Sequence, residues 1–182
     1  MKRKVAILIV SYNGVALLRE CLTSLRASAD PEVDQRIFIV DNDSQDGTEA
    51  YIRDEWPQVH LIPLDANVGF SGGNNRGWNA IRDAIPDISY VLLLNQDTVV
   101  DRRFLVPLVR YMDEHPHVGC AQPALMLYPQ KDAVNSLGNV IHFLGFGYSS
   151  YNGWHEHDVS MRISSINSKI SGVIFETASS FL

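Results

Sequence analysis

The sequence predicts an α/β fold in which a mostly parallel sheet is flanked by helices and is followed by an irregular or antiparallel second half. Short apolar runs alternate with segments of helical periodicity over the first 117 residues. The runs are apolar at nearly every position, which is typical of strands covered on both faces. Alternating strands and helices indicate βαβ units, and these units build parallel sheets.

Four strands are expected in the first half, each from an apolar run that ends in a polar cluster. They are Val5–Val10, Ile37–Val40, Val59–Ile62 and Tyr90–Leu94. The last of these is the most apolar, so we expect it to be the most deeply buried strand. Val5–Val10 follows Met-Lys-Arg-Lys and therefore looks like a signal peptide, but its apolar part is only six residues long. We interpret it as a first strand of a cytoplasmic protein.

Four helices are expected between and after these strands, from apolar residues at three- and four-residue spacing. They are Ala16–Leu25, Thr48–Trp56, Trp78–Ile85 and Phe104–Met112. Pro57, Pro86 and Pro116 follow three of them and would end each helix. The glycine-rich stretch Asn67–Gly77 before the third helix is expected to be a loop.

The sequence changes character near Val118, after which Tyr, Phe, Ser, Asn and Gly dominate and helical periods become rare. We find neither a linker nor an internal repeat. The expected organisation is therefore one domain over residues 1–182, with a first half at 1–117 and a partial second half at 118–182.

Composition excludes several classes of protein. The 182 residues carry a net charge of −6, with a pI near 5.4, which argues against a nucleic-acid partner. The two cysteines, Cys21 and Cys120, fit no zinc or redox spacing and are expected to be reduced, buried thiols. The apolar runs are much shorter than the ~20 residues of a membrane-spanning helix.

Polar residues gather where each expected strand ends. The four clusters are Ser11–Gly14, Asp41–Thr48, Asn67–Asn75 and Asn95–Thr98. Because ligands of parallel α/β sheets bind beyond the carboxyl ends of the strands, four such clusters predict a binding site at this edge.

Two carboxylates stand out in these clusters. Asp41 directly ends a strand, where its carboxylate could accept the imide N–H of a pyrimidine base. Asp97 follows the most apolar run, and a Mg²⁺ or Mn²⁺ ion bridging it to a diphosphate would explain a carboxylate there. The alternative for each is a turn or a helix cap, and we favour capping for Asp43, Ser44 and Asp46.

Together, the clusters Val10-Ser11-Tyr12-Asn13, Val40-Asp41-Asn42-Asp43-Ser44, Asn67-Val68-Gly69-Phe70 and Leu94-Asn95-Gln96-Asp97 resemble the family 2 glycosyltransferases. The resemblance covers residues 4 to about 128. The loop Asn67–Asn75 looks most like the bacterial branch that builds cell-surface polysaccharide and includes rhamnosyltransferases. The resemblance to the family implies the GT-A nucleotide-diphospho-sugar transferase fold, with a Rossmann-like sheet. It also implies a metal-dependent transfer of a sugar with inversion.

The resemblance also implies roles for single residues. Ser11 and Tyr12 would line the nucleoside pocket, Asp41 would bind the base, and Asp97 would bind the metal. Three further residues, Asn67, Gly69 and Asn75, would border the donor, together with Asn95. The implied donor is a dTDP- or UDP-linked sugar, with rhamnose among the candidates, and the implied acceptor is a saccharide or a lipid-linked sugar. Peripheral association with the cytoplasmic face of the membrane and the oligomeric state stay open.

Two departures from the family pattern affect this interpretation. Asn95 stands where the metal motif usually has its first carboxylate. The acidic motif that supplies the family's catalytic base does not occur before Leu182, so we expect the base beyond this residue and expect the chain to be truncated. Glu156, Asp158 and Glu176 are the other acidic candidates, and each is a weak one.

Two other functions remain open. A non-catalytic carbohydrate-binding or scaffolding module would fit the absent base and the aromatic second half. A sugar nucleotidyltransferase would share the sheet but should carry a glycine- and arginine-rich loop where Ser11–Gly14 stand. The sequence predicts a donor-binding glycosyltransferase domain ahead of both.

Overall fold

The computed structural model describes residues 2–128, 132–137, 139–141, 147–149, 151–155, 157–159 and 177–179. The chain forms two compact units, Met1–Thr98 and Val99–Leu182. The expected functional division at residues 117 and 118 stays a prediction.

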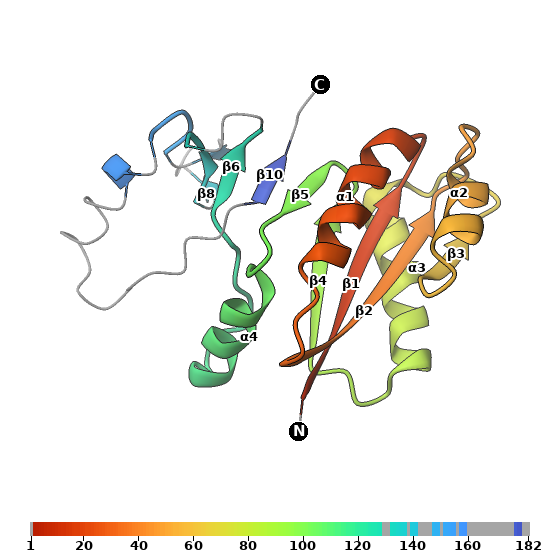
Figure 1. Cartoon of the computed structure of the whole chain (residues 1–182), viewed down its shortest axis with the longest axis horizontal. Coiled ribbons are helices and arrows are strands. Elements are labelled where there is room, and N and C mark those ends of the chain that lie inside the picture. The colour runs from red at the N-terminus through yellow and green to blue at the C-terminus, as the bar shows by residue number, and fades with distance from the viewer. Residues whose placement is uncertain are drawn as a thin grey trace. The chain divides into compact units, whose positions relative to one another are not determined.

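The first unit is built on a parallel four-stranded sheet with the strand order β3-β2-β1-β4 (Figure 1). Its strands are β1 (Arg3–Ser11), β2 (Val33–Asp41), β3 (His60–Pro63) and β4 (Tyr90–Asn95). The connecting helices are α1 (Val15–Ala27), α2 (Thr48–Glu55) and α3 (Gly69–Ala84). The expected parallel sheet flanked by helices is confirmed.

Helices cover the sheet because both faces of its central strands are apolar. Ala6 and Leu8 of β1 pack with Phe38 and Val40 of β2 against Ile81 of α3. The alternate residues of β1, including Ile7 and Ile9, are also fully buried. Figure 1 shows α1 on the opposite side of the sheet from α3. These two layers hold the strand ends in fixed register.

The glycine-rich stretch is helical, contrary to the expected loop, because α3 begins at Gly69. Its glycines let the helix approach β1 closely. A Cβ on Gly73 would lie 2.7 Å from Cγ1 of Val10, and one on Gly77 would collide with the side chain of Leu8. The glycines therefore serve packing, which outweighs their poor helix propensity.

Strand β4 is not the most buried strand, contrary to the sequence expectation. Leu93 is 55 % exposed, whereas the centre of β1 is fully buried. Among the described strands, β4 lies at one end of the sheet order and β1 lies inside it. The apolar composition of Tyr90–Leu94 is therefore not a measure of its depth.

Strand β5 (Thr98–Val100) spans the boundary between the units, and the second unit contains α4 (Leu105–Glu114) and short strands in small sheets. Strand β6 (Leu125–Leu127) pairs antiparallel with β7 (Val134–Ser136) and parallel with β10 (Thr177–Ser179). Strands β8 (Asn139–Ile141) and β9 (Gly147–Ser149) form an antiparallel pair. The expected antiparallel and irregular second half is confirmed in these segments.

Two further features bear on the composition arguments. Cys21 is fully buried and Cys120 is exposed, so the expectation of two buried thiols was wrong for Cys120, which lies in the irregular segment after α4. Across the described ranges, every helix is too short or too polar to span a bilayer.

Candidate functional site

Register places the predicted polar clusters at one edge of the sheet. Ser11 pairs with Asp41 at the ends of β1 and β2, and Asn95 pairs with Val10 at the end of β4. Asp41 also pairs with Pro63 at the end of β3. All four strands are parallel, so the loops that follow them leave the sheet at the same side.

Asp41 is only 3 % exposed, and its Oδ1 atom is buried with no hydrogen-bond partner among the described residues. Burial raises the pKa of this carboxyl; hydrogen bonding from Ser44 opposes the rise, and the charges of Glu49 and Asp46 add to it. A buried carboxylate oxygen without a partner is costly, so the arrangement favours a ligand that donates a hydrogen bond there.

Asp97 presents the same feature at the end of β4. Its Oδ1 atom is buried and has no hydrogen-bond partner in the part of the chain that the structure describes. Burial raises the pKa of Asp97, and the hydrogen bond from its own backbone N–H opposes the rise. A bound cation would compensate the desolvated charge.

The loop after β1 is tied to the loop after β2 by side chains. The Asn13 N–H donates to Oγ of Ser44 at 3.0 Å, and the Gln45 N–H donates to Oδ1 of Asn13 at 2.8 Å. Asp46 accepts from the N–H of Val15 at 2.9 Å and from the N–H of Thr48 at 3.1 Å.

Asp46 therefore serves the first residues of both α1 and α2, which confirms the expected capping role for this residue. Burial acts to raise its pKa, but hydrogen bonds from Thr48 and Val15 outweigh that effect and hold the pKa below its ordinary value. Ser44 was expected to cap a helix, but it caps neither α1 nor α2. Its hydroxyl instead accepts from the N–H of Asn13 in the loop after β1.

The loop before α3 is held by Asn42, whose side chain is almost fully buried. Its Nδ2 donates to Oδ1 of Asn67 at 2.8 Å, and its Oδ1 accepts from the N–H of Val68 at 2.9 Å. Gly69 has a φ of +74°, a conformation that favours glycine, and its N–H donates to Oδ1 of Asn67 at 2.9 Å. These bonds fix the start of α3 beside the end of β2.

Six of the eight predicted site residues lie at or near the ends of the strands. Ser11, Asp41 and Asp97 lie where the strands end, and Asn67 and Gly69 are linked to that edge through Asn42. Tyr12 is 46 % exposed in the loop after β1.

The other two predicted residues, Asn75 and Asn95, have fewer contacts with the loops of the site. Asn75 lies on the second turn of α3 and is exposed; the described residues give it no side-chain bond to these loops. Asn95 ends β4, and its carbonyl oxygen accepts from the Sγ of Cys21 at 3.9 Å.

Two residues of the site were not singled out from the sequence. Asn42 organises the Asn67–Gly69 segment, and Gln96 contacts the loop after β1 through its side-chain amide. Both stand inside the recognised clusters. Their amides bond to the protein itself, so residue type alone gave no signal that separates them from their neighbours.

A metal fits this edge only together with ligand oxygens. Within the described ranges, no group of three or more His, Cys, Asp or Glu side chains could hold an ion by itself. Mg²⁺ and Mn²⁺ commonly bind through one or two carboxylates and complete their shell with phosphate oxygens and water. The buried, unpartnered oxygen of Asp97 suits that mode of binding.

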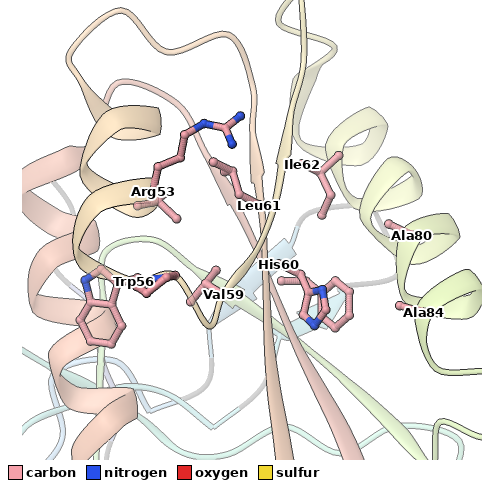
Figure 2. Close-up of a pocket in the computed structure, with 11 residues that line it drawn as sticks. Arg53, Trp56, Val59, His60, Leu61, Ile62, Ala80 and Ala84 are labelled. Carbon is pink, nitrogen blue, oxygen red and sulfur yellow. The ribbon is translucent and has the colours of Figure 1, made fainter.

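A cavity of about 540 Å³ lies elsewhere in the first unit, around β3 (Figure 2). Figure 2 shows Arg53 of α2 and Trp56, the residue after α2, on one side of the strand and Ala80 and Ala84 of α3 on the other. Most of the side chains around the cavity are apolar, and none of the site residues predicted from the sequence is among them. The Arg53 guanidinium is already paired with Glu49 at 2.6 Å.

None of the described contacts assigns a role to the acidic candidates of the second half. Asp158 is exposed, and Glu156 and Glu176 lie outside the described residues. The Tyr151 and Trp154 rings pack edge to face with their centroids 5.5 Å apart, and Trp154 is 41 % exposed.

Comparison with solved structures shows the fold. S. aureus TarS 1–349 in complex with UDP has a TM-score of 0.54 at 18 % identity, over 80 % of this chain and 43 % of that one. Another S. aureus TarS structure has a TM-score of 0.51 at 19 % identity, over 79 % of this chain and 23 % of that one. The mannosyltransferase PcManGT from Pyrobaculum calidifontis, in complex with GDP-Man and Mn²⁺, has a TM-score of 0.50 at 18 % identity, over 70 % of this chain and 36 % of that one.

These likenesses confirm the expected GT-A fold, and the chain spans less than half the length of each of these structures. No protein of curated function matches the sequence closely enough to count as a relative. The sequence model described as "Glycosyl transferase family 2" matches residues 6–168. That match covers well over half of the residues, and the chain therefore belongs to glycosyl transferase family 2.

Proposed function

We propose that this chain binds the nucleotide-diphosphate sugar donor of an inverting glycosyltransferase. The single observation that carries the proposal is the pair of buried carboxylate oxygens, on Asp41 and Asp97, that have no partner among the described residues. Asp41 ends β2 and Asp97 lies two residues after β4, at the edge of one parallel sheet where ligands of such folds bind. Family membership supports the sugar chemistry.

The two carboxylates have different tasks in this proposal. Asp41 accepts the imide N–H of a uracil or thymine base, with Ser11 and Tyr12 beside it. Asp97 holds Mg²⁺ or Mn²⁺ together with the diphosphate oxygens. When bound, the metal supplies positive charge that neutralises the departing nucleotide diphosphate. Asn67, Gly69, Asn75 and Asn95 border the sugar side of the donor.

The neighbouring folds support a nucleotide donor without choosing the base. The structures at TM-scores of 0.50 and 0.54 were solved with GDP-Man and with UDP, respectively. A buried carboxylate that accepts an imide N–H favours UDP- or dTDP-linked sugars, and we propose rhamnose among the sugars. The acceptor is a saccharide or a lipid-linked sugar of a cell-surface polysaccharide, reached at the cytoplasmic face of the membrane.

Calorimetric titration of the whole chain with UDP and with dTDP, each with and without Mn²⁺, tests the proposal. We expect binding that Mn²⁺ strengthens, that Asp97→Ala reduces to the metal-free level and that Asp41→Asn weakens. At 100 times its Kd, the ligand should also raise the free energy of unfolding by about 2.7 kcal/mol. Asp83→Ala, an exposed substitution on α3, is the matched control and should leave the affinity unchanged.

The same titration separates the alternatives. A carbohydrate-binding or scaffolding module would bind sugars regardless of nucleotide and metal. A folded chain that binds neither UDP nor dTDP in the presence of Mn²⁺ would refute the donor site.

A further inference from the structure

We propose that Gln96 is a positioning residue that holds the loop after β1 in the shape needed to receive the nucleoside. This inference rests on the proposed function, because the loop contains Ser11 and Tyr12. The side-chain amide of Gln96 makes the hydrogen bonds that support it. The proposal assigns Gln96 to the nucleoside end of the donor and not to the metal.

The Gln96 amide makes three hydrogen bonds across the gap between the two loops. Its Oε1 accepts from Oγ of Ser11 at 2.7 Å and from the N–H of Tyr12 at 3.1 Å. Its Nε2 donates to the carbonyl oxygen of Tyr12 at 3.4 Å. The side chain thus pairs with both backbone polar groups of Tyr12, as a neighbouring strand would.

These bonds begin where the sheet stops. The pairing of β1 with β4 ends at Val10 and Asn95, so Ser11 and Gln96 would form the next pair if the strands continued. There the Gln96 side chain takes over from the backbone. It extends the connection by one residue and reaches Tyr12, which lies just outside β1.

Gly14 provides a second, independent observation. A Cβ at this position would lie 2.5 Å from Cδ, Nε2 and Oε1 of Gln96. The φ of Gly14 is −134°, which other residues adopt readily, so backbone conformation does not require glycine here. The space that Gly14 leaves is the space that the Gln96 amide occupies.

The loop shape can be measured without any ligand. The exchange rate of the Tyr12 amide hydrogen, followed by NMR, reports the opening of its bond to Gln96. Gln96→Met keeps the length of the side chain and removes the bonds, and it should speed exchange at Tyr12 at least tenfold. Gln96→Glu keeps the acceptor and should restore most of the protection.

Gln58→Met, an exposed glutamine after α2, is the matched control and should leave Tyr12 unaffected. Protection at Tyr12 that is unchanged in Gln96→Met would overturn the proposal.

A double substitution tests the packing argument. Gly14→Ala alone should displace the amide and speed exchange at Tyr12. In a chain that already carries Gln96→Ala, the same change should add little, because the crowded side chain is gone. Fully additive effects of the two substitutions would contradict the proposed contact.

Nucleotide affinity then separates positioning from metal binding. Gln96→Met should weaken metal-free UMP and UDP with Mn²⁺ by a similar factor, about tenfold for the lost bonds. Asp97→Asn should weaken only the metal-dependent complex. Equal UMP affinity in Gln96→Met and the unmodified chain would overturn the proposal.

If the unmodified chain bound no nucleotide, the proposed function would fail, and the exchange experiment would still decide the role of Gln96.

Discussion

Asp97 is a charged group that the fold keeps partly desolvated. Burial raises its pKa above the ordinary value of 3.8, and one of its oxygens has no hydrogen-bond partner among the described residues. Above pH 3.8 the unfolded chain releases this proton more readily than the folded chain does. The free energy of unfolding therefore falls as the pH rises from 3.8 through the raised pKa, and above that pKa the full cost of burying the charge remains.

Asp97→Asn should remove that penalty. We expect the free energy of unfolding at neutral pH, in the presence of EDTA, to rise by about 0.5–2 kcal/mol, the range that single stabilising substitutions commonly give. The gain should shrink as the pH falls towards 3.8 and vanish below it, where Asp97 is protonated in both states. Urea titrations at several pH values measure it, and Asp83→Asn is the control. A loss of stability at neutral pH would contradict this account of Asp97.

Cys21 and Cys120 should differ strongly in reactivity. Burial, with a further contribution from the charge of Asp97, raises the pKa of Cys21 to about 12, whereas Cys120 is exposed. The thiolate is the reactive form, so we expect one fast-reacting thiol per folded chain at pH 8 and two in urea. Labelling with a chromogenic disulfide, with Cys120→Ser as the control, measures this. Two equally fast thiols in the folded chain would contradict the burial of Cys21 beneath the site.

Sequence reasoning at this scale identified the two carboxylates with an unpartnered oxygen and missed the two amides that hold the loops. Asp41 and Asp97 could be proposed because a carboxylate at the end of an apolar strand needs an explanation. Asn42 and Gln96 could not, because their roles depend on which backbone groups come within reach once the loops are folded.

At the scale of elements, Asp46 joins the beginnings of two helices. The N-cap positions of α1 and α2 are glycines, which have no side chain to act as a cap, and Asp46 accepts from the first N–H of each helix. Asp46→Ala should therefore lower the free energy of unfolding by about 1–2 kcal/mol, the upper part of the range for a lost cap.

The control for this substitution is Asp83→Ala, because Asp83 is an exposed carboxylate near the end of α3. We expect it to change the free energy of unfolding by less than about 0.5 kcal/mol. Thermal and urea unfolding of the two variants measure the difference. Equal effects would show that Asp46 is an ordinary surface residue.

The order and type of the elements in the first unit followed from the spacing of apolar residues. The start of α3 did not, because glycine has a poor helix propensity and the tight contact of Gly73 and Gly77 with β1 is a tertiary effect. The depth of β4 was also mispredicted, because an apolar run indicates a strand without saying how many neighbours the strand has.

At the scale of the whole molecule, the first unit contains every residue predicted to bind the donor. Those residues occupy positions 11 to 97, and the unit ends at Thr98. The cavity around β3 lies in the same unit but is lined mainly by apolar side chains and shares none of these residues. We therefore expect the nucleotide to bind at the carboxyl ends of the strands and not beside β3.

Mapping the bound nucleotide by NMR tests this claim most directly. We would titrate the whole ¹⁵N-labelled chain with UDP and Mg²⁺ and follow each backbone amide. The account predicts the largest shifts at Tyr12, Asn42, Gly69 and Asp97, and their loss in Asp97→Ala. Shifts centred on Trp56 and His60, or no shifts from a folded chain, would contradict it.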